Sequence, residues 1–178
     1  MFKYDGNNVD VICAVEYAND LIMSNDFLSK IAAKKQFDMS EAKGRDVVSY
    51  IEYFFTGMFG RLHVNVYTSK NPWSKAYGYF NPNKPNQIYL NSRKLNRSHA
   101  SITASLIHEL IHFLDTKTGF YFGHGNNSPV GKENTIPYWV DNLAEEMIKG
   151  DESKTGSFAY NIVTPWYYRL LNTIKRWF

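Results

Sequence analysis

The segment from Ile102 to Asp115, ITASLIHELIHFLD, combines the pattern of a buried helix with residues that can carry chemistry. Its apolar residues nearly encircle a helix, which predicts that this helix lies inside the protein. Two histidines, His108 and His112, stand four positions apart and therefore share one helical face. Polar side chains on a buried helix are costly unless they are paired or bind a metal. The segment thus predicts either a metal site or a core helix with hydrogen-bonded histidines.

The residue that follows the first histidine favours the metal site. Two imidazoles one turn apart can bind a single zinc ion at about 2.0–2.1 Å. Glu109 is turned by about 100° around the helix axis, so its carboxylate can reach a water beside the metal without binding the metal. This is the logic of the HExxH motif, in which the glutamate is the general base. Chance would place this motif in roughly 0.6% of chains of this composition.

A catalytic zinc usually has three protein ligands, and two residues downstream compete for the third position. His124 stands in FGHGNN, where the flanking glycines let the backbone fold back toward the helix. We favour His124. The alternative is Glu145 in the segment NLAEE, and Glu146 is a weaker alternative of the same kind.

Two further acidic residues are expected to support the site and not to bind the metal. Asp115 lies nearly on the face of His112, but it is too close along one rigid helix to complete a tetrahedron. We expect it to cap the helix or to orient a ligand. Asp141 shares a helical face with Glu145, so this pair could also orient a metal ligand.

The rest of the chain predicts an α+β fold. We expect a small antiparallel sheet packed on the HExxH helix, with additional N- and C-terminal helices. The helix is expected to begin at Asn96 or Ser98 and to run to about Lys117. We expect the 178 residues to form one domain. Its parts are a helical N-terminal part over 1–60, a catalytic core over 61–150, and a linker with a C-terminal helix over 151–178. Other expected helices cover 9–37, 41–55, 137–150 and 165–178, and expected strands cover 61–69, 76–81 and 87–91.

Composition excludes several classes of protein. The single cysteine, Cys13, excludes an internal disulfide framework and a zinc ribbon, and it fits a reducing compartment. The sequence shows no secretory signal and no membrane span. We therefore expect a cytoplasmic protein, or one in an infected cell or virion if a phage encodes it. The net charge of +3 is only mildly basic, so it gives weak support for association with nucleic acid.

From Tyr77 to His124 the chain resembles the zincin metallopeptidases, most closely the SprT-like domain proteases. The resemblance rests on the strand QIYLN, the helix ITASLIHELIHFLD and the following GHG. It implies that His108, His112 and His124 bind zinc and that Glu109 is the catalytic base. The sequence does not match the metzincin motif HExxHxxGxxH, because Asp115 stands at the position of its glycine and Thr118 at that of its third histidine. The sequence also lacks a C-terminal Cys-rich zinc ribbon. The arrangement HELIH…NLAEE is also similar to gluzincin-like proteases, in which a downstream glutamate is the third ligand.

These features predict a zinc metallopeptidase that acts on a protein or peptide. Tyr77, Tyr79 and Tyr138 are the candidates for stabilising the oxyanion. QIYLN is expected to form the rim of the cleft and to pair with an extended substrate. His63 and His99 are expected to be ordinary histidines. The alternative function is a non-catalytic structural or interaction protein of zincin fold, for example a phage component.

Overall fold

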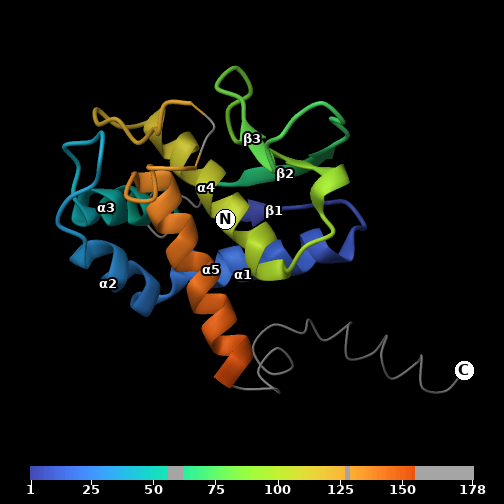
Figure 1. Ribbon diagram of the computed structural model, residues 1–178, viewed down its shortest axis with the longest axis horizontal. Coiled ribbons are helices and arrows are strands. Elements are labelled where there is room, and N and C mark those ends of the chain that lie inside the picture. Colours follow the sequence, from blue (N-terminus) through green and yellow to red (C-terminus); the bar gives the residue numbers. More distant parts are fainter. Residues whose placement is uncertain (56–61, 127–128, 155–178) are drawn as a thin grey trace, which may run out of the picture.

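The computed structural model describes residues 1–55, 62–126 and 129–154, the last four of them as backbone only (Figure 1). These residues form a mixed α+β structure, as the sequence predicts. The expected C-terminal helix over 165–178 lies outside the described residues. The helices are α1 (Val9–Met23), α2 (Asn25–Ala33), α3 (Gly44–Phe55), α4 (His99–Asp115) and α5 (Ile136–Lys154), with a short 3-10 helix at Ser92–Lys94. The strands are β1 (Phe2–Lys3), β2 (Val64–Ser69), β3 (Gly78–Phe80) and β4 (Gln87–Asn91).

The N-terminal helices begin where side chains can cap them. The side chain of Asn8 accepts a hydrogen bond from the backbone of Val11 at the start of α1, and Ser24 does the same at the start of α2. Each bond satisfies one of the backbone N–H groups that a helix leaves unpaired at its first turn. Because Ser24 also ends α1, the region predicted as helical over 9–37 is two helices that meet at this residue.

The sheet is mixed, so the prediction of an antiparallel sheet is wrong in part. Its strand order is β1-β2-β4-β3. Only β3 and β4 pair antiparallel, through the predicted turn, where Asn86 adopts the left-handed conformation that asparagine tolerates. Strand β2 runs parallel to β4, because the chain crosses past β4 before it turns back through β3. The two-residue strand β1, which was not predicted, pairs parallel with β2.

This strand order also corrects the expected position of QIYLN. That segment is β4, and β2 and β3 cover it on both sides. It therefore cannot offer a free edge to a substrate. The free edge nearest to it belongs to β3.

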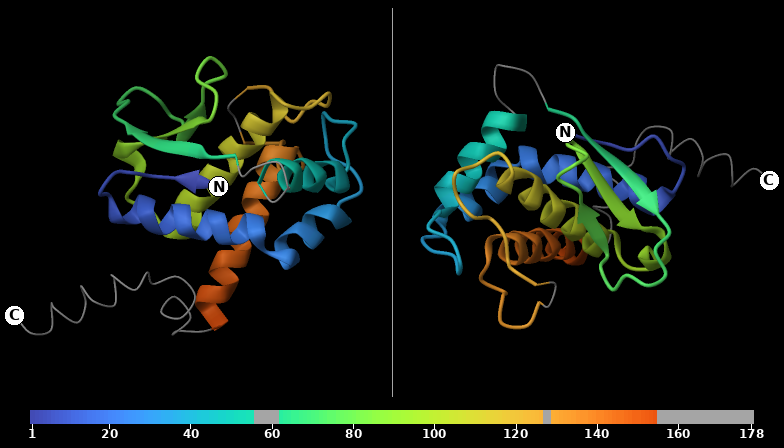
Figure 2. Two further views of the ribbon diagram at one scale, coloured as in Figure 1. Left: turned by 180° about the vertical axis from the view of Figure 1, so that it is seen from behind. Right: turned by 90° about the horizontal axis from the view of Figure 1, so that it is seen from above.

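Helix α4 is the centre of the structure. It packs against α1, α5, β3 and β4, and Figure 2 shows it between the sheet and α5. Its N-cap is Ser98, one of the two predicted residues, and it ends at Asp115, two residues before the predicted end. Eleven of its residues are buried. The polar face that carries the histidines is therefore built into a helix whose other faces are fixed by the core.

Helix α5 crosses α4 and brings acidic residues to it (Figure 1). It begins at Ile136 with Pro137 in its first turn, as predicted, but it continues through Gly150 to Lys154. Glycine weakens a helix interior by only about 1 kcal/mol relative to alanine, so it does not by itself end a helix. Among the described residues, the structure has no helix long and apolar enough to span a membrane.

Candidate metal centre

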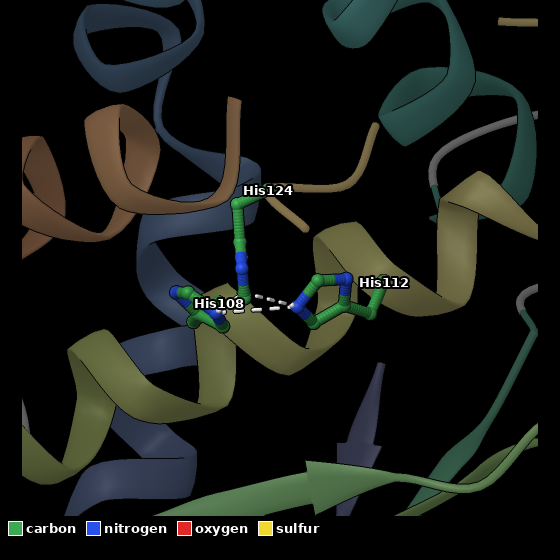
Figure 3. Close-up of side chains that lie close together, drawn as sticks. All are labelled: His108, His112 and His124. Carbon is green, nitrogen blue, oxygen red and sulfur yellow. Dashed lines mark hydrogen bonds between the residues drawn. The ribbon is translucent and has the colours of Figure 1, made fainter. Parts of the chain in front are cut away.

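Three histidines meet on the polar face of α4. His108 and His112 come from the helix and His124 from the loop that follows it, and Figure 3 shows the three rings converging. The Nε2 atom of His124 lies 3.1 Å from that of His108 and 3.0 Å from that of His112. The Nε2 atoms of His108 and His112 are 3.2 Å apart. Among the described residues this is the only group of three or more side chains arranged to hold a metal ion.

The tautomer of His124 is fixed by a neighbouring carbonyl, and none of the three rings carries a net charge. The Nδ1 atom of His124 lies 3.0 Å from the carbonyl oxygen of Asn126, which can only accept, so Nδ1 carries the proton. Burial lowers the pKa of His108 to about 4 and that of His112 to about 3, and it also lowers the pKa of His124. All three rings are therefore uncharged near neutral pH. A neutral imidazole with its proton on Nδ1 offers the lone pair of Nε2 to a metal ion, and the Asn126 carbonyl holds His124 in that form.

The spacing of the nitrogens fits a tetrahedral zinc ion. Two ligands at about 2.05 Å from zinc are about 3.3 Å apart at the tetrahedral angle. The observed sides of the triangle, 3.0–3.2 Å, are close to that value. Neutral imidazole is also a ligand that zinc prefers, and three protein ligands leave one position open, as catalytic sites require. The residues present therefore fit zinc.

The loop that carries His124 is tied back to α4 by the side chain of Asp115, and the side chain of Tyr121 forms a bond within the loop. Asp115 Oδ1 accepts a hydrogen bond of 2.6 Å from the backbone N–H of Phe122. The hydroxyl of Tyr121 accepts a bond of 3.1 Å from the N–H of Gly125, which has a φ of 72°. That backbone conformation favours glycine, as the GHG sequence anticipates. Asp115 thus holds the loop at the end of α4 and lies outside the group of three histidines.

Glu109 is buried beside the histidines. Its exposed fraction is 8%, and a backbone hydrogen bond links it to Phe80 in β3. Burial raises the pKa of Glu109 to about 8, against the opposing effect of the Phe80 bond. A divalent cation nearby favours the ionised carboxylate and would shift this pKa downward. Glu109 therefore holds a proton that a metal ion can release.

Asp141 of α5 orients His108. Its Oδ2 atom lies 2.7 Å from Nδ1 of His108, on the side of the ring away from the other histidines. Burial raises the pKa of Asp141 to about 8 and lowers that of His108, so the isolated pair is uncharged as a whole near neutral pH. A cation at Nε2 favours the arrangement in which Nδ1–H donates to an ionised Asp141. Asp141 is thus the acid of α5 that lies against one of the three histidines.

The alternative third ligand lies apart from the three histidines. Glu145 pairs with Lys149 at 2.5 Å, one turn further along α5, and Glu146 is exposed. Neither belongs to the group that could hold a metal. Of the two remaining histidines, His63 is exposed and His99 lies 3.0 Å from Asp10.

The three candidate tyrosines lie in different places. The ring of Tyr138 in α5 is centred 4.7 Å from the rings of both His108 and His124. Burial, Asp141 and Glu109 together raise its pKa, so its hydroxyl keeps its proton. Tyr77 and Tyr79 are exposed at β3. Of the three candidates, Tyr138 is therefore the one that lies against the histidines.

Two contacts of the site have no signal in the sequence. The carbonyl of Asn126 fixes the proton of His124, and the Lys132 ammonium donates to the same oxygen at 2.6 Å. The backbone of Phe80 reaches Glu109 because β3 lies beside α4. Backbone groups are identical in every residue, so residue types cannot reveal these contacts.

The chain was compared with protein-family models, curated proteins and solved structures. No protein-family model, no curated protein and no solved structure matches the chain.

Proposed function

We propose that this protein is a zinc-dependent peptidase of the zincin type, with His108, His112 and His124 as the metal ligands. The observation that carries the proposal is the triangle of Nε2 atoms, 3.0–3.2 Å on each side, next to the buried carboxylate of Glu109. A purely structural zinc site has no need of a buried carboxylate beside its ligands. The position of His124 supports the SprT-like variant of the proposal over the gluzincin-like one.

The residues of this chain have distinct parts in the proposed reaction. Zinc, when bound, lowers the pKa of a water molecule and polarises the carbonyl that is attacked. Glu109 takes a proton from the attacking water as a new C–O bond forms. It then delivers that proton to the amine nitrogen as the C–N bond breaks, which yields a carboxylate and an amine.

Two residues of α5 complete the proposed site. Asp141 holds His108 in the orientation that points Nε2 at the metal. Tyr138 carries a protonated hydroxyl close to the ligands, so it is our candidate for donating a hydrogen bond to the oxyanion. Strand addition of the substrate is assigned to the free edge of β3, since β4 has none.

The test compares the wild-type protein with Glu109→Gln. We expect one zinc per chain in both proteins by native mass spectrometry. We expect cleavage of a mixed peptide library by the wild type alone, with a loss of at least about 10²-fold in the variant. Exposed Glu146→Gln is the matched control and should behave as the wild type. A zinc-loaded wild type that leaves every peptide uncut would overturn the proposal in favour of a non-catalytic protein.

A further inference from the structure

The free edge of the sheet lies beside Glu109. Strand β3 pairs only with β4 among the described strands. The N–H of Asn91 donates to the carbonyl of Tyr77 at 2.8 Å, and the register continues from Gly78 opposite Leu90. Since hydrogen-bonded and non-bonded pairs alternate in an antiparallel ladder, the backbone groups of Gly78 and Phe80 point away from β4. The hydrogen bond between Phe80 and Glu109 lies on that open side.

A ladder of stacked tyrosines crosses the outer face of the sheet and ends at this edge. The ring of Tyr89 in β4 lies 5.5 Å from that of Tyr67 in β2 and 4.8 Å from that of Tyr79 in β3. Both pairs stand directly opposite each other in the strand register. Tyr79 is 42% exposed, and no described strand pairs beyond it. One more aromatic ring could therefore stack on Tyr79 from the open side of β3.

The next outward position along β3 carries positive charge. Tyr77 precedes Tyr79 by two residues and so points to the same face. Lys94 Nζ lies 5.1 Å and the Arg97 guanidinium carbon 4.4 Å from the centre of the Tyr77 ring. Among the described residues no carboxylate oxygen lies within 4.0 Å of either cation, and Glu145 acts on Arg97 at longer range.

The segment that contains the sheet strands β2, β3 and β4 is also positively charged. Residues 53–108 include seven lysines and arginines and no aspartate or glutamate. The sheet and its loops therefore attract acidic ligands.

We infer that the site selects extended segments with an aromatic side chain and an acidic side chain two residues apart. This inference rests on the proposed peptidase function. A segment added to the open edge of β3 would place one side chain opposite Tyr79 and another opposite Tyr77. Side chains opposite each other on neighbouring strands are about 4.5–5.5 Å apart, which is the spacing of the tyrosine ladder. The aromatic side chain continues the ladder, and the acidic one meets Lys94 and Arg97.

Gly78, between the two tyrosines, keeps this edge open next to Glu109. A Cβ atom at this position would lie 3.0 Å from the carbonyl oxygen of Tyr89 and 3.4 Å from Cγ of Glu109. Glycine therefore lets the strand and the carboxylate approach each other closely. The proposed general base in α4 thus approaches β3 at the residue that lies between the two tyrosines.

Peptide binding to the zinc-loaded, full-length Glu109→Gln protein tests the inference without turnover. The probes are fluorescein-labelled Thr/Ser peptides that contain Tyr-Thr-Glu, Glu-Thr-Tyr, Ala-Thr-Glu or Tyr-Thr-Gln, read by fluorescence anisotropy. The first order fits an antiparallel segment and the second a parallel one. We expect one of these two to bind about 3- to 10-fold tighter than the Ala-Thr-Glu peptide. The Tyr-Thr-Gln peptide should lose about 2- to 5-fold, and more at low salt.

Variants of the protein assign the effect to the named residues. Tyr79→Ala should abolish the preference for tyrosine, Tyr79→Phe should keep it, and Lys94→Gln should reduce the preference for glutamate. Tyr53→Ala, at an exposed tyrosine of α3, is the control and should change neither. Equal binding of the tyrosine and alanine peptides, a preference that survives in Tyr79→Ala, or no binding of any probe would overturn the inference. The peptidase proposal is tested by a different measurement, the cleavage of peptides by the wild type, so the two proposals can fail independently.

Discussion

His108 and His112 reach the proposed metal site from one rigid helix, whereas His124 reaches it from a loop. The helical pair is held by the hydrogen-bonded backbone of α4 and by the core around it. The loop histidine depends on a few side-chain contacts, chiefly those of Asp115 and Tyr121. A ligand on a helix is positioned before the metal arrives, while a ligand on a tethered loop is only as well positioned as its tethers. This difference predicts which changes weaken the site most.

The largest effect is expected from removing a ligand. His112→Ala leaves one helical and one loop ligand, and we expect zinc affinity to fall by about 10³-fold or more. His124→Ala leaves the helical pair intact and should bind zinc more tightly than His112→Ala does. Competition with a chromophoric chelator measures both, with exposed His63→Ala as the control. Equal losses in the two variants would contradict the distinction between helix and loop.

The second effect concerns the buried carboxylate on the helix. Because the folded pKa of Glu109 is raised to about 8, its contribution to stability is complete at low pH and is lost as the pH rises toward 8. In the presence of a metal chelator, the wild type should therefore lose stability relative to Glu109→Gln between about pH 5 and 8. The expected slope is about 1 kcal/mol per pH unit. Urea unfolding at several pH values measures it, and parallel curves would contradict the assigned burial.

The third effect tests the support of a helical ligand. Asp141→Asn removes the charge that favours the Nδ1–H form of His108, and we expect zinc affinity to fall by about 10- to 100-fold. Exposed Glu146→Gln, on the same helix, should leave it unchanged. Chelator competition gives both values. Wild-type affinity in Asp141→Asn would show that packing alone orients His108.

The smallest effect tests the tether of the loop. Asp115→Ala removes the acceptor for the N–H of Phe122, so the loop must be ordered when zinc binds. We expect zinc affinity to fall by about 3- to 10-fold with the fold retained. Asp26→Ala, at an exposed ion pair far along the chain, is the control. A loss as large as that of His124→Ala would mean that Asp115 does more than hold the loop.

The features that depend on local periodicity can be predicted from the order of the residues alone. The apolar pattern of ITASLIHELIHFLD specifies a buried helix, and the spacing of His108 and His112 places both on one face of it. The cap at Ser98 and the hairpin turn before β4 are equally local. These features were predictable because helical and strand periods act over a few residues.

Which distant residues join that helix depends on long-range contacts in the folded protein. His124 and not Glu145 meets the two helical histidines, and Asp141 reaches His108 across the contact between α4 and α5. The order of the strands, with β4 inside the sheet and β3 at its edge, was also set at this level. The physical reason is that such contacts are selected by the packing of the whole core. Spacing along the chain limits which residues can meet, but it does not choose among them.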